Sequence, residues 1–550
     1  MTQNRRTPDG TADMLFEECE AEKKVTGSLE KIFEVAGYRQ VRTPGVEFLS
    51  VFSGAAQYFS NESMYKFTDF KGRILTLRPD STIPIARMTA TRLRGHKLPI
   101  KMYYSQSVYR QQEVHKGRSS EIMQMGVELI GESSFSSDVD MIALAIASLE
   151  EAYQGSYRIE IGHVGFYNLL MDKLEADAED RERVHRYITS KNYAALDEIT
   201  AKFDDDRTAE ILNKLPRLFG GEEALASAAA LFSGYDDRAS EMIDYLSNVI
   251  RELAARGFSD KVVIDLGLVN AAEYYSSLVF RGYGESAGEP LLSGGRYDNL
   301  FSEFGEDLPA TGFGVNVDLL YEALLSDKLS AESGVSSGAV PRNGKLRIAL
   351  TKGRLEKDFV RFMESAGYDM TPLLEKGRKL LIEIPEAGVE IFLAKAPDVI
   401  TYVEHGVCEI GIVGKDTIVE HGGTYYEIMD LGVGKCRFAL ATPGGRDFFD
   451  GYGAKVVATK YPNVAGRYFE SKGLDVEIIK IEGSVEIAPL LGIADGIVDL
   501  VETGTTLKEN GLEVIEYIRD ISARLIVNVT GMKLMKREID ELVESLSKVI

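Results

Sequence analysis

The sequence is poor in cysteine and histidine. Its 550 residues include three cysteines, six histidines and no tryptophan. Cys19, Cys408 and Cys436 are far apart and odd in number, so they provide neither a disulfide framework nor a zinc-binding spacing. This usage fits a reducing cytoplasm. The histidines are scattered without metal-ligand spacing, so we expect no metal ion held by the protein alone.

Long apolar runs are also missing. No stretch reaches the ~18 consecutive apolar residues that a membrane-spanning helix needs. The first ten residues, Met1–Gly10, lack the apolar segment of a secretory signal. The sequence therefore predicts a cytoplasmic protein without a membrane span.

Positive charge is under-represented. Lys and Arg number 63 against 86 Asp and Glu, which gives a formal net charge of −23. Nucleic-acid affinity depends on Lys and Arg neutralising phosphates, so extended nucleic-acid binding is disfavoured. A small phosphorylated substrate held by a few local cations is compatible with this charge. The content of 44% hydrophobic and 27% charged residues is ordinary for a globular protein.

The length predicts about two to four domains, at ~100–200 residues each. Residues 326–344 are rich in Ser and Gly, contain a proline and show no hydrophobic period, which predicts a flexible linker. The alternative is a long surface loop within one domain. Because a strand pattern begins directly afterwards, we place the domains at residues 1–325 and 345–550.

The C-terminal part alternates short apolar runs with helical patterns, which favours α/β architecture. Helices are predicted for Leu355–Ala366 and Lys533–Val549. Strands are predicted at Leu346–Leu350, Glu409–Val413, Phe438–Ala441, Lys455–Ala458, Val476–Ile481, Ile497–Val501 and Leu525–Val529.

The N-terminal part is predicted to be an α+β domain. A charged segment of helical pattern, at about residues 173–256, predicts a helical insertion in it. Strands rich in aromatic and β-branched residues are predicted at Lys101–Tyr109, Gly126–Ile130, Tyr157–Ile161, Val262–Leu266 and Tyr275–Arg281.

One junction in the C-terminal part carries the strongest chemical signal. The buried strand Ile497–Val501 runs into a hydroxyl-rich turn, Thr503–Thr506, and a helix is predicted to start at Leu507. Free backbone N–H groups, threonine hydroxyls and a helix N-terminus together make a phosphate cradle. Asp499 and Glu502 beside the turn can accept hydrogen bonds from sugar hydroxyls. The junction therefore predicts a phosphorylated sugar as ligand.

Further candidate cations follow other predicted strands. Lys352 and Arg354 open a predicted helix, where cations are unusual unless an anionic ligand is bound nearby. The alternative is a basic helix start on the surface. Arg378 and Lys379 add cations before a strand, and taken alone they favour a solvated edge. Gly411–Asp416 is another strand-end turn, the place where α/β folds bind ligands.

From Lys345 to Ile550 these motifs resemble, in order, the short form of ATP phosphoribosyltransferase, the enzyme that opens histidine biosynthesis. The family signature is complete at Glu486, Gly492, Ala494, Ile497, Asp499, Leu500, Thr503, Gly504, Thr506 and Leu507. Further matches are Thr351–Arg354, Arg378–Leu380, Asp398–Val399, Tyr402–Glu404, Gly411–Asp416 and Leu431–Arg437. The resemblance implies a two-lobed α/β fold like that of periplasmic binding proteins, with the active site in the cleft.

The resemblance also implies the reaction. Adenine N1 of ATP attacks the ribose C1 of phosphoribosyl pyrophosphate (PRPP), pyrophosphate leaves, and N1-(5-phosphoribosyl)-ATP forms. The ribose is assigned to Asp499 and Glu502. The 5-phosphate is assigned to the turn residues Thr503, Gly504, Thr505 and Thr506.

The leaving pyrophosphate needs cations, for which Lys352, Arg354 and Arg378 are the candidates, and Mg²⁺ bound mainly through PRPP and pyrophosphate. Adenine N1 is already a nucleophile, so Glu486 is assigned to positioning a substrate. One position departs from the family: Lys395 stands where relatives often carry arginine. A lysine ammonium group is a point charge and cannot make the paired hydrogen bonds of a guanidinium.

Residues 10–322 resemble the catalytic domain of histidyl-tRNA synthetase, a class II fold built on an antiparallel sheet. The matching segments are Leu75–Thr82, Tyr103–Gly131, Leu268–Phe280 and Gly294–Leu300. The resemblance implies an amino-acid pocket for histidine. Its candidate residues are Asp80, Thr82, Arg110, Gln124, Glu128, Tyr274 and Tyr275.

Three departures argue against tRNA charging. Gln111–Gln112 replaces the usual carboxylate of the second class II motif, and Asn270 and Leu319 replace two arginines that would hold ATP phosphates. No anticodon-binding domain follows residue 322. This half therefore resembles the regulatory subunit of ATP phosphoribosyltransferase, here fused ahead of the catalytic subunit. Histidine is expected in the synthetase-like pocket, and an inter-domain site is the alternative.

Three hypotheses follow: a transferase inhibited by histidine through its own front half, a ligand-binding sensor without catalysis, and a bifunctional enzyme that also activates histidine. The intact signature favours the first over the second. Asn270 and Leu319 disfavour the third. Separate subunits assemble in equal numbers, so a one-to-one fusion predicts a homo-oligomer.

Overall fold

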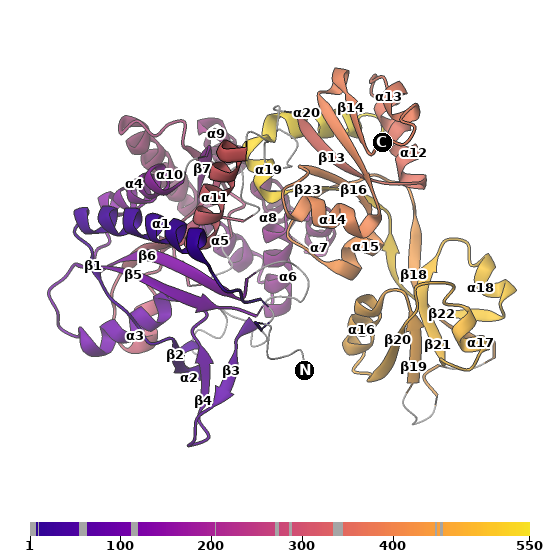
Figure 1. Cartoon of the computed structure of the whole chain (residues 1–550), viewed down its shortest axis with the longest axis horizontal. Helices are drawn as coiled ribbons and strands as arrows, with labels where there is room; N and C mark the ends of the chain where they lie inside the picture. Colours follow the sequence, from indigo (N-terminus) through magenta and orange to yellow (C-terminus); the bar gives the residue numbers. More distant parts are fainter. Residues whose placement is uncertain are drawn as a thin grey trace. The chain divides into compact units, whose positions relative to one another are not determined.

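The computed structural model describes residues 7–8, 10–53, 63–111, 119–153, 155–203, 205–269, 274–284, 289–333, 345–445, 448–450 and 455–550. The chain divides into two compact units, Met1–Pro341 (unit 1) and Arg342–Ile550 (unit 2), which Figure 1 traces along the sequence. The domain bounds 1–325, 326–344 and 345–550 stay predictions. No helix in the described ranges is both long and apolar enough to cross a membrane.

A nine-stranded sheet forms the centre of unit 1. All neighbouring strands are antiparallel except at β1–β5 and β7–β9. In spatial order the strands are β1 (Arg39–Gln40), β5 (Ile100–Tyr109), β6 (Glu121–Ile130), β12 (Ala310–Asn316), β11 (Leu292–Arg296), β10 (Leu278–Gly284), β7 (Tyr157–His163), β9 (Val262–Asp265) and β8 (Phe219–Gly220). A smaller sheet contains β2 (Val46–Phe48), β4 (Ile74–Leu77) and β3 (Lys66–Thr68).

Helices cover the large sheet and confirm the predicted α+β class. They are α1 (Phe16–Val35), α2 (Leu49–Ser53), α3 (Thr82–Arg92), α4 (Phe135–Ala152), α5 (Gly165–Lys173), α6 (Ala178–Thr189), α7 (Tyr193–Thr200), α8 (Asp206–Lys214), α9 (Glu222–Leu231), α10 (Asp237–Ala255) and α11 (Val317–Ser333). The helix α1 packs against both α4 and α11; α1 and α11 lie against β6, while α4 lies against β12 and β11 (Figure 1). Phe33, Ile142 and Leu320, one from each helix, are fully buried in the main core.

Two boundaries in unit 1 differ from the sequence prediction. The helix α11 continues to Ser333, past residue 326 where the linker was predicted to begin, because Leu329, Ala331 and Glu332 are good helix formers. The strand predicted at Tyr275–Arg281 lies further along, at Leu278–Gly284.

The first sheet of unit 2 has six strands. In spatial order they are β14 (Leu381–Ile384), β15 (Val389–Ala394), β13 (Leu346–Thr351), β16 (Ile410–Gly414), β23 (Ala523–Val527) and β17 (Tyr426–Asp430). Its helices are α12 (Arg354–Ser365), α13 (Thr371–Leu374), α14 (Ala396–Glu404), α15 (Lys415–His421), α19 (Val529–Leu534) and α20 (Lys536–Ser547). The terminal helix predicted at Lys533–Val549 is thus two helices that meet at Met535.

The second sheet of unit 2 has five strands: β20 (Val476–Lys480), β19 (Lys455–Thr459), β21 (Gly496–Val501), β18 (Cys436–Pro443) and β22 (Leu512–Ile521). Its helices are α16 (Pro462–Ser471), α17 (Ile487–Leu490) and α18 (Thr505–Glu509). Successive side chains of β21 point to opposite faces of the sheet. Ile497 and Val501 therefore belong to the hydrophobic cluster on one face, and Val498 belongs to the cluster on the other face. All seven predicted strands of this part are present, which confirms the α/β class.

Two side-chain contacts between the sheets of unit 2 differ in burial: one is buried and the other is exposed to solvent. The carboxylate of Glu420, at the end of α15, accepts the backbone N–H groups of Asn463 (3.2 Å) and Val464 (3.1 Å) at the start of α16. Glu420 is only 8% exposed. Arg354 pairs with Glu502 at 3.1 Å, and these side chains are 63% and 56% exposed.

Candidate functional site

In both sheets of unit 2, three parallel strands end at one edge. The strands β15, β13 and β16 are parallel neighbours, and so are β20, β19 and β21. Ligands of α/β folds bind outside the carboxyl ends of such strands. The predicted turns Thr351–Arg354 and Gly411–Asp416 lie at this edge of the six-stranded sheet, and Thr503–Thr506 lies at the corresponding edge of the five-stranded sheet.

Two side-chain contacts bring these edges together. The Arg354 guanidinium donates to both carboxylate oxygens of Glu502, at 3.1–3.2 Å. The Tyr461 hydroxyl, just after β19, donates to Asp416 at 3.2 Å. Residues from both sheets of unit 2 are therefore in contact at these edges. Arg354, assigned to pyrophosphate, and Glu502, assigned to ribose, lie in direct contact.

The hydroxyl-rich turn is open to solvent. Gly504 has φ +76°, a left-handed conformation that glycine adopts without strain. The hydroxyls of Thr503 and Thr505 lie 3.0 Å apart, and both side chains are exposed, as is Thr506. The helix begins at Thr505, not at the predicted Leu507. Since α18 spans only Thr505–Glu509, its backbone N–H groups and hydroxyls matter more than a helix dipole.

Asp499 is half-buried on β21, opposite the small side chain of Ala439 on β18. Burial raises the pKa of Asp499 to about 6, with a further increase from the Glu486 carboxylate, while the N–H of Leu500 and the charge of Lys460 lower it. Glu486 lies at the start of α17 and is half-buried. The structure thus brings the two predicted carboxylates, Asp499 and Glu486, within electrostatic reach of each other.

Lys460 was missed by the sequence prediction. It follows β19, the middle of the three parallel strands, and its charge lowers the pKa of Asp499 on one side and of Glu482 on the other. Its backbone is fixed because the hydroxyl of the preceding Thr459 donates to Val498 O (2.6 Å) and accepts from Tyr461 N–H (2.9 Å). A lone lysine in a polar loop has no sequence signal; only the strand order identifies it.

The remaining predicted cations lie on the six-stranded sheet. Lys352 follows β13, and its N–H donates to Ala394 O at the end of β15, so Lys352 and Lys395 occupy neighbouring strand ends. Both side chains are exposed. Arg378 is exposed in the turn before β14, and no contact in the described part of the chain joins it to Arg354 or Glu502.

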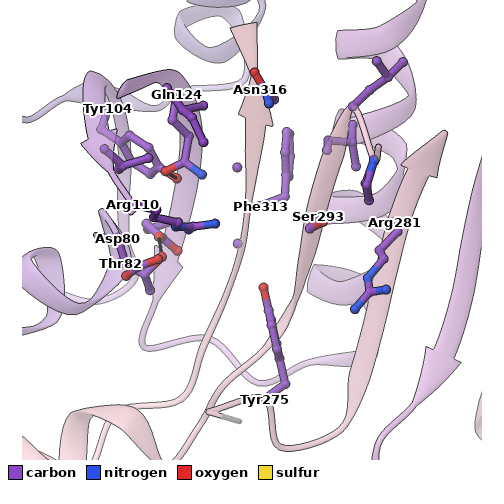
Figure 2. Close-up of a pocket in the computed structure, with 18 of the residues that line it drawn as sticks. Asp80, Thr82, Tyr104, Arg110, Gln124, Tyr275, Arg281, Ser293, Phe313 and Asn316 are labelled. Atoms are coloured by element: carbon purple, nitrogen blue, oxygen red, sulfur yellow. Dashed lines mark hydrogen bonds between the residues drawn. The ribbon is translucent and has the colours of Figure 1, made fainter. Parts of the chain in front are cut away.

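Unit 1 contains a separate cavity of about 460 Å³. All the residues predicted for a histidine pocket line it: Asp80, Thr82, Arg110, Gln124, Glu128, Tyr274 and Tyr275. Figure 2 shows that Arg110, Asp80 and Thr82 lie on one side, Gln124 and Asn316 at one end, and Tyr275 at the other. Other lining residues that the sequence prediction missed include Tyr104, Arg281, Ser293, Tyr297 and Asn316.

Glu128 is the most deeply buried acid of the cavity, with 2% of its surface exposed. The Thr82 hydroxyl donates to it at 2.7 Å, and the Tyr297 hydroxyl donates to its other oxygen. Burial raises the pKa of Glu128 to about 8, although these two hydrogen bonds lower it. Burial also raises the pKa of Asp80, whose carboxylate accepts the Ile83 N–H at 2.9 Å. Two buried acids favour a ligand that brings a positive charge.

Glycines make room for these side chains. A Cβ on Gly312 would lie 2.1 Å from Glu128 Oε2, and one on Gly295 would lie 2.6 Å from Tyr275. A Cβ on Gly314 would lie 2.8 Å from Gln124. The central strands β11 and β12 are therefore glycine-rich because the cavity lies directly over them.

Of the departures from the synthetase pattern, Leu319 lies within the described residues, and it and the preceding Asp318 make contacts within unit 1. Leu319 packs against the main core of unit 1, and Asp318 accepts the Met123 N–H at 3.1 Å. Burial raises the pKa of Asp318 to about 7. Neither side chain can supply an arginine's donors to a nucleotide. Gln112 and Asn270 lie outside the described residues.

Comparison with known proteins divides the chain in two. Residues 10–320 match the family model described as histidyl-tRNA synthetase, and residues 395–548 match the model described as ATP phosphoribosyltransferase.

Curated relatives divide the chain in the same way. ATP phosphoribosyltransferase of Clostridium kluyveri is 57% identical over 199 residues, 36% of this chain and 91% of the relative. The ATP phosphoribosyltransferase regulatory subunit of Clostridium acetobutylicum is 38% identical over 320 residues, 58% of this chain and 78% of the relative.

A solved structure from Bacillus halodurans, described as an ATP phosphoribosyltransferase regulatory subunit/histidyl-tRNA synthetase, is 30% identical with a TM-score of 0.55. The match covers 72% of this chain and 94% of the chain in that solved structure.

Proposed function

The chain belongs to the histidyl-tRNA synthetase family over residues 10–320 and to the ATP phosphoribosyltransferase family over residues 395–548, and we propose that the first region regulates the second. The second region is a pentosyltransferase that joins ATP and PRPP into N1-(5-phosphoribosyl)-ATP and pyrophosphate, the first step of histidine biosynthesis. The chain is thus a fusion of two proteins that occur separately in relatives.

We propose that PRPP binds between the two strand-end edges of unit 2. The observation that carries this proposal is the contact of Arg354 with Glu502, which joins the edges at the predicted substrate residues. The two sheets would then be two lobes around a cleft, as in periplasmic binding proteins. The 5-phosphate is assigned to the turn Thr503–Thr506 and the ribose hydroxyls to Asp499 and Glu502.

The pyrophosphate is assigned to Lys352, Arg354 and Arg378, which stabilise negative charge as it develops on the leaving group. When PRPP binds, Arg354 exchanges the Glu502 carboxylate for a phosphate. Both partners are more than half exposed, so this exchange costs little, about 0–1 kcal/mol for a surface ion pair. Glu486 is assigned to orienting a substrate next to Asp499.

Mg²⁺ fits this donor set as an ion brought by the substrate. Mg²⁺ usually keeps several waters and binds through one or two carboxylates plus substrate phosphates. Asp499 and Glu486 offer two carboxylates, and the described residues contain no cluster of three or more His, Cys, Asp or Glu that could hold a metal. When bound, the ion neutralises charge on the pyrophosphate.

We assign Lys460, whose charge acts on Asp499, to a phosphate of PRPP, and replacing it with glutamine is expected to raise KM for PRPP about tenfold, since one charge-assisted contact is lost. The KM for ATP should change far less. Steady-state kinetics with each substrate varied in turn checks this. Lys472→Gln is the matched control, because Lys472 belongs to the same five-stranded half but pairs with Glu516. A wild-type KM for PRPP in Lys460→Gln would remove Lys460 from the site.

For unit 1 we propose that histidine binds in the cavity around Glu128 and inhibits the transferase. The two buried acids favour a cationic ligand, and feedback requires coupling between this site and the catalytic one. Leu319 and Asp318 provide no phosphate-binding donors, which supports regulation rather than histidine activation. No nucleic-acid partner is assigned to a chain of net charge −23, and a homo-oligomer is the expected assembly.

The assay that separates the hypotheses measures pyrophosphate release by the full chain. Release that requires both ATP and PRPP is expected. A ligand-binding sensor would release none. Histidine-dependent exchange of pyrophosphate into ATP without PRPP would instead show that unit 1 activates histidine.

A further inference from the structure

Asn316 is a residue of the unit 1 cavity to which the family resemblance assigned no role. It ends β12 and pairs with Gln124 on β6, so the two side chains lie on the same face of the sheet, with their Cβ atoms about 4.5–5.5 Å apart. Both line the cavity. Figure 2 shows them at the same end of it, with the nitrogen of Gln124 turned toward the strand that carries Asn316.

Each of these two amides is held through its oxygen. The Asn316 Oδ1 accepts the N–H groups of Asp318 (3.1 Å) and Leu319 (3.4 Å) in the first turn of α11. The Gln124 Oε1 accepts the Tyr104 hydroxyl at 3.3 Å. Because the oxygens are fixed as acceptors, the NH₂ groups are fixed on the other side of each amide, and among the described residues neither nitrogen donates to a protein atom. That end of the cavity therefore presents two oriented N–H donors.

The donors are separated from the buried acid along β12. A Cβ at Gly314 would lie 2.8 Å from Gln124 Nε2, whereas one at Gly312 would meet Glu128 Oε2. Because Gly312 and Gly314 are two residues apart, the two positions are roughly 7 Å apart at ~3.4 Å per residue. A ligand that reaches both carries a cation and an acceptor group several bonds apart, as a free amino acid with a basic side chain does.

The chemistry of the two amide nitrogens selects the kind of group that binds there. An amide NH₂ group can only donate, so the pair favours an acceptor. A carboxylate offers one oxygen to each of two neighbouring donors, and a charged acceptor makes the stronger hydrogen bond. Arg281 and Glu289 also line the cavity, but their charges oppose each other and do not by themselves select the sign of a bound group.

We propose that Asn316, together with Gln124, binds the carboxylate of the amino acid held in this cavity, so that the cavity selects free amino acids over their alcohols. The proposal rests on the proposed binding of histidine at Glu128 and names the residue that recognises its other end. The substitution Asn316→Asp keeps an oxygen for the N–H groups of Asp318 and Leu319 and turns the donor into a charged acceptor.

Calorimetric titration of the full chain with histidine and with histidinol, which has a hydroxymethyl group in place of the carboxylate, tests this. The wild type should bind histidine about 10- to 100-fold more tightly than histidinol, the value of one charge-assisted contact. Asn316→Asp should lose or reverse that preference, because the new carboxylate repels that of histidine. Gln124→Glu, which keeps an oxygen for the Tyr104 hydroxyl, should do the same. Histidinol binding retained by either variant shows that its cavity is intact.

Asn192→Asp is the matched control, since Asn192 likewise accepts a first-turn N–H, that of Ala195 in α7, but does not line the cavity. It should keep the wild-type preference. A full preference for histidine in Asn316→Asp would overturn the role of Asn316 and leave the proposed histidine site standing. Equal binding of the two ligands by the wild type would overturn carboxylate recognition. Absence of histidine binding by the wild type would overturn the proposed site together with it.

Discussion

Replacing Asp499 with alanine is expected to lower kcat/KM for PRPP about 100-fold. The carboxylate is assigned to the ribose hydroxyls, and charged hydrogen bonds contribute about 1.5–3 kcal/mol each, with a factor of ten for every 1.4 kcal/mol. Steady-state kinetics with PRPP varied at saturating ATP measures the loss. Asp475→Ala, at an exposed aspartate before β20, is the control and should behave as wild type.

The pH dependence of the same parameter gives a second check. Because burial raises the pKa of Asp499 to about 6, the carboxylate is ionised above that pH and accepts hydroxyl donors. Below it the protonated acid loses acceptor capacity, so kcat/KM should fall about tenfold per pH unit. In Asp499→Asn, kcat/KM for PRPP should be lower at high pH than in the wild type, and its decrease below pH 6 should disappear. Wild-type kinetics in both variants would exclude Asp499 from the PRPP site.

The second large effect concerns inhibition. In Glu128→Gln, the histidine concentration that halves activity should rise about 10- to 100-fold, because a buried carboxylate facing a cationic ligand is replaced by a neutral amide. Each variant is compared with its own rate without histidine. Glu150→Gln, at an exposed glutamate of α4, is the control. Unchanged inhibition in Glu128→Gln would move the histidine site elsewhere in the chain.

The raised pKa of Glu128, about 8, sets the direction of a pH effect on inhibition. Below that pH the ligand-free acid is mainly protonated, and a cationic ligand stabilises its ionised form. Binding therefore releases a proton, and inhibition should strengthen as the pH rises from about 6.5 to 8. The Glu128→Gln variant should lack this dependence.

The sequence predicted the parts of the structure that local pattern determines. The strand Ile497–Val501 and the turn after it were identified because burial and small residues follow one another along the chain. Helix ends were less exact: Thr505 begins α18 two positions before the prediction, since a hydroxyl-rich turn offers no apolar period to mark the first helical residue.

What escaped prediction depends on pairing between distant segments. That Lys460 lies near Asp499 follows only from the strand order β20-β19-β21. That Arg281 lines the cavity follows only from its neighbours on β11 and across the cavity. The strands β11 and β12 were missed because Gly294, Gly295 and Gly312 interrupt the hydrophobic alternation that identifies a strand. Those glycines are the residues that leave space for the cavity.

Two of the contacts between the sheets of unit 2, Glu420 with the start of α16 and Arg354 with Glu502, have unequal strength, and this bears on how the halves can separate. Withdrawing the buried Glu420 from the N–H groups of Asn463 and Val464 costs about 1.5–3 kcal/mol for each charged hydrogen bond. Separating the exposed Arg354 and Glu502 costs about 0–1 kcal/mol. The easiest movement is therefore a rotation about an axis near α15 and α16. Such a rotation frees a cation on one side and a carboxylate on the other in the same step.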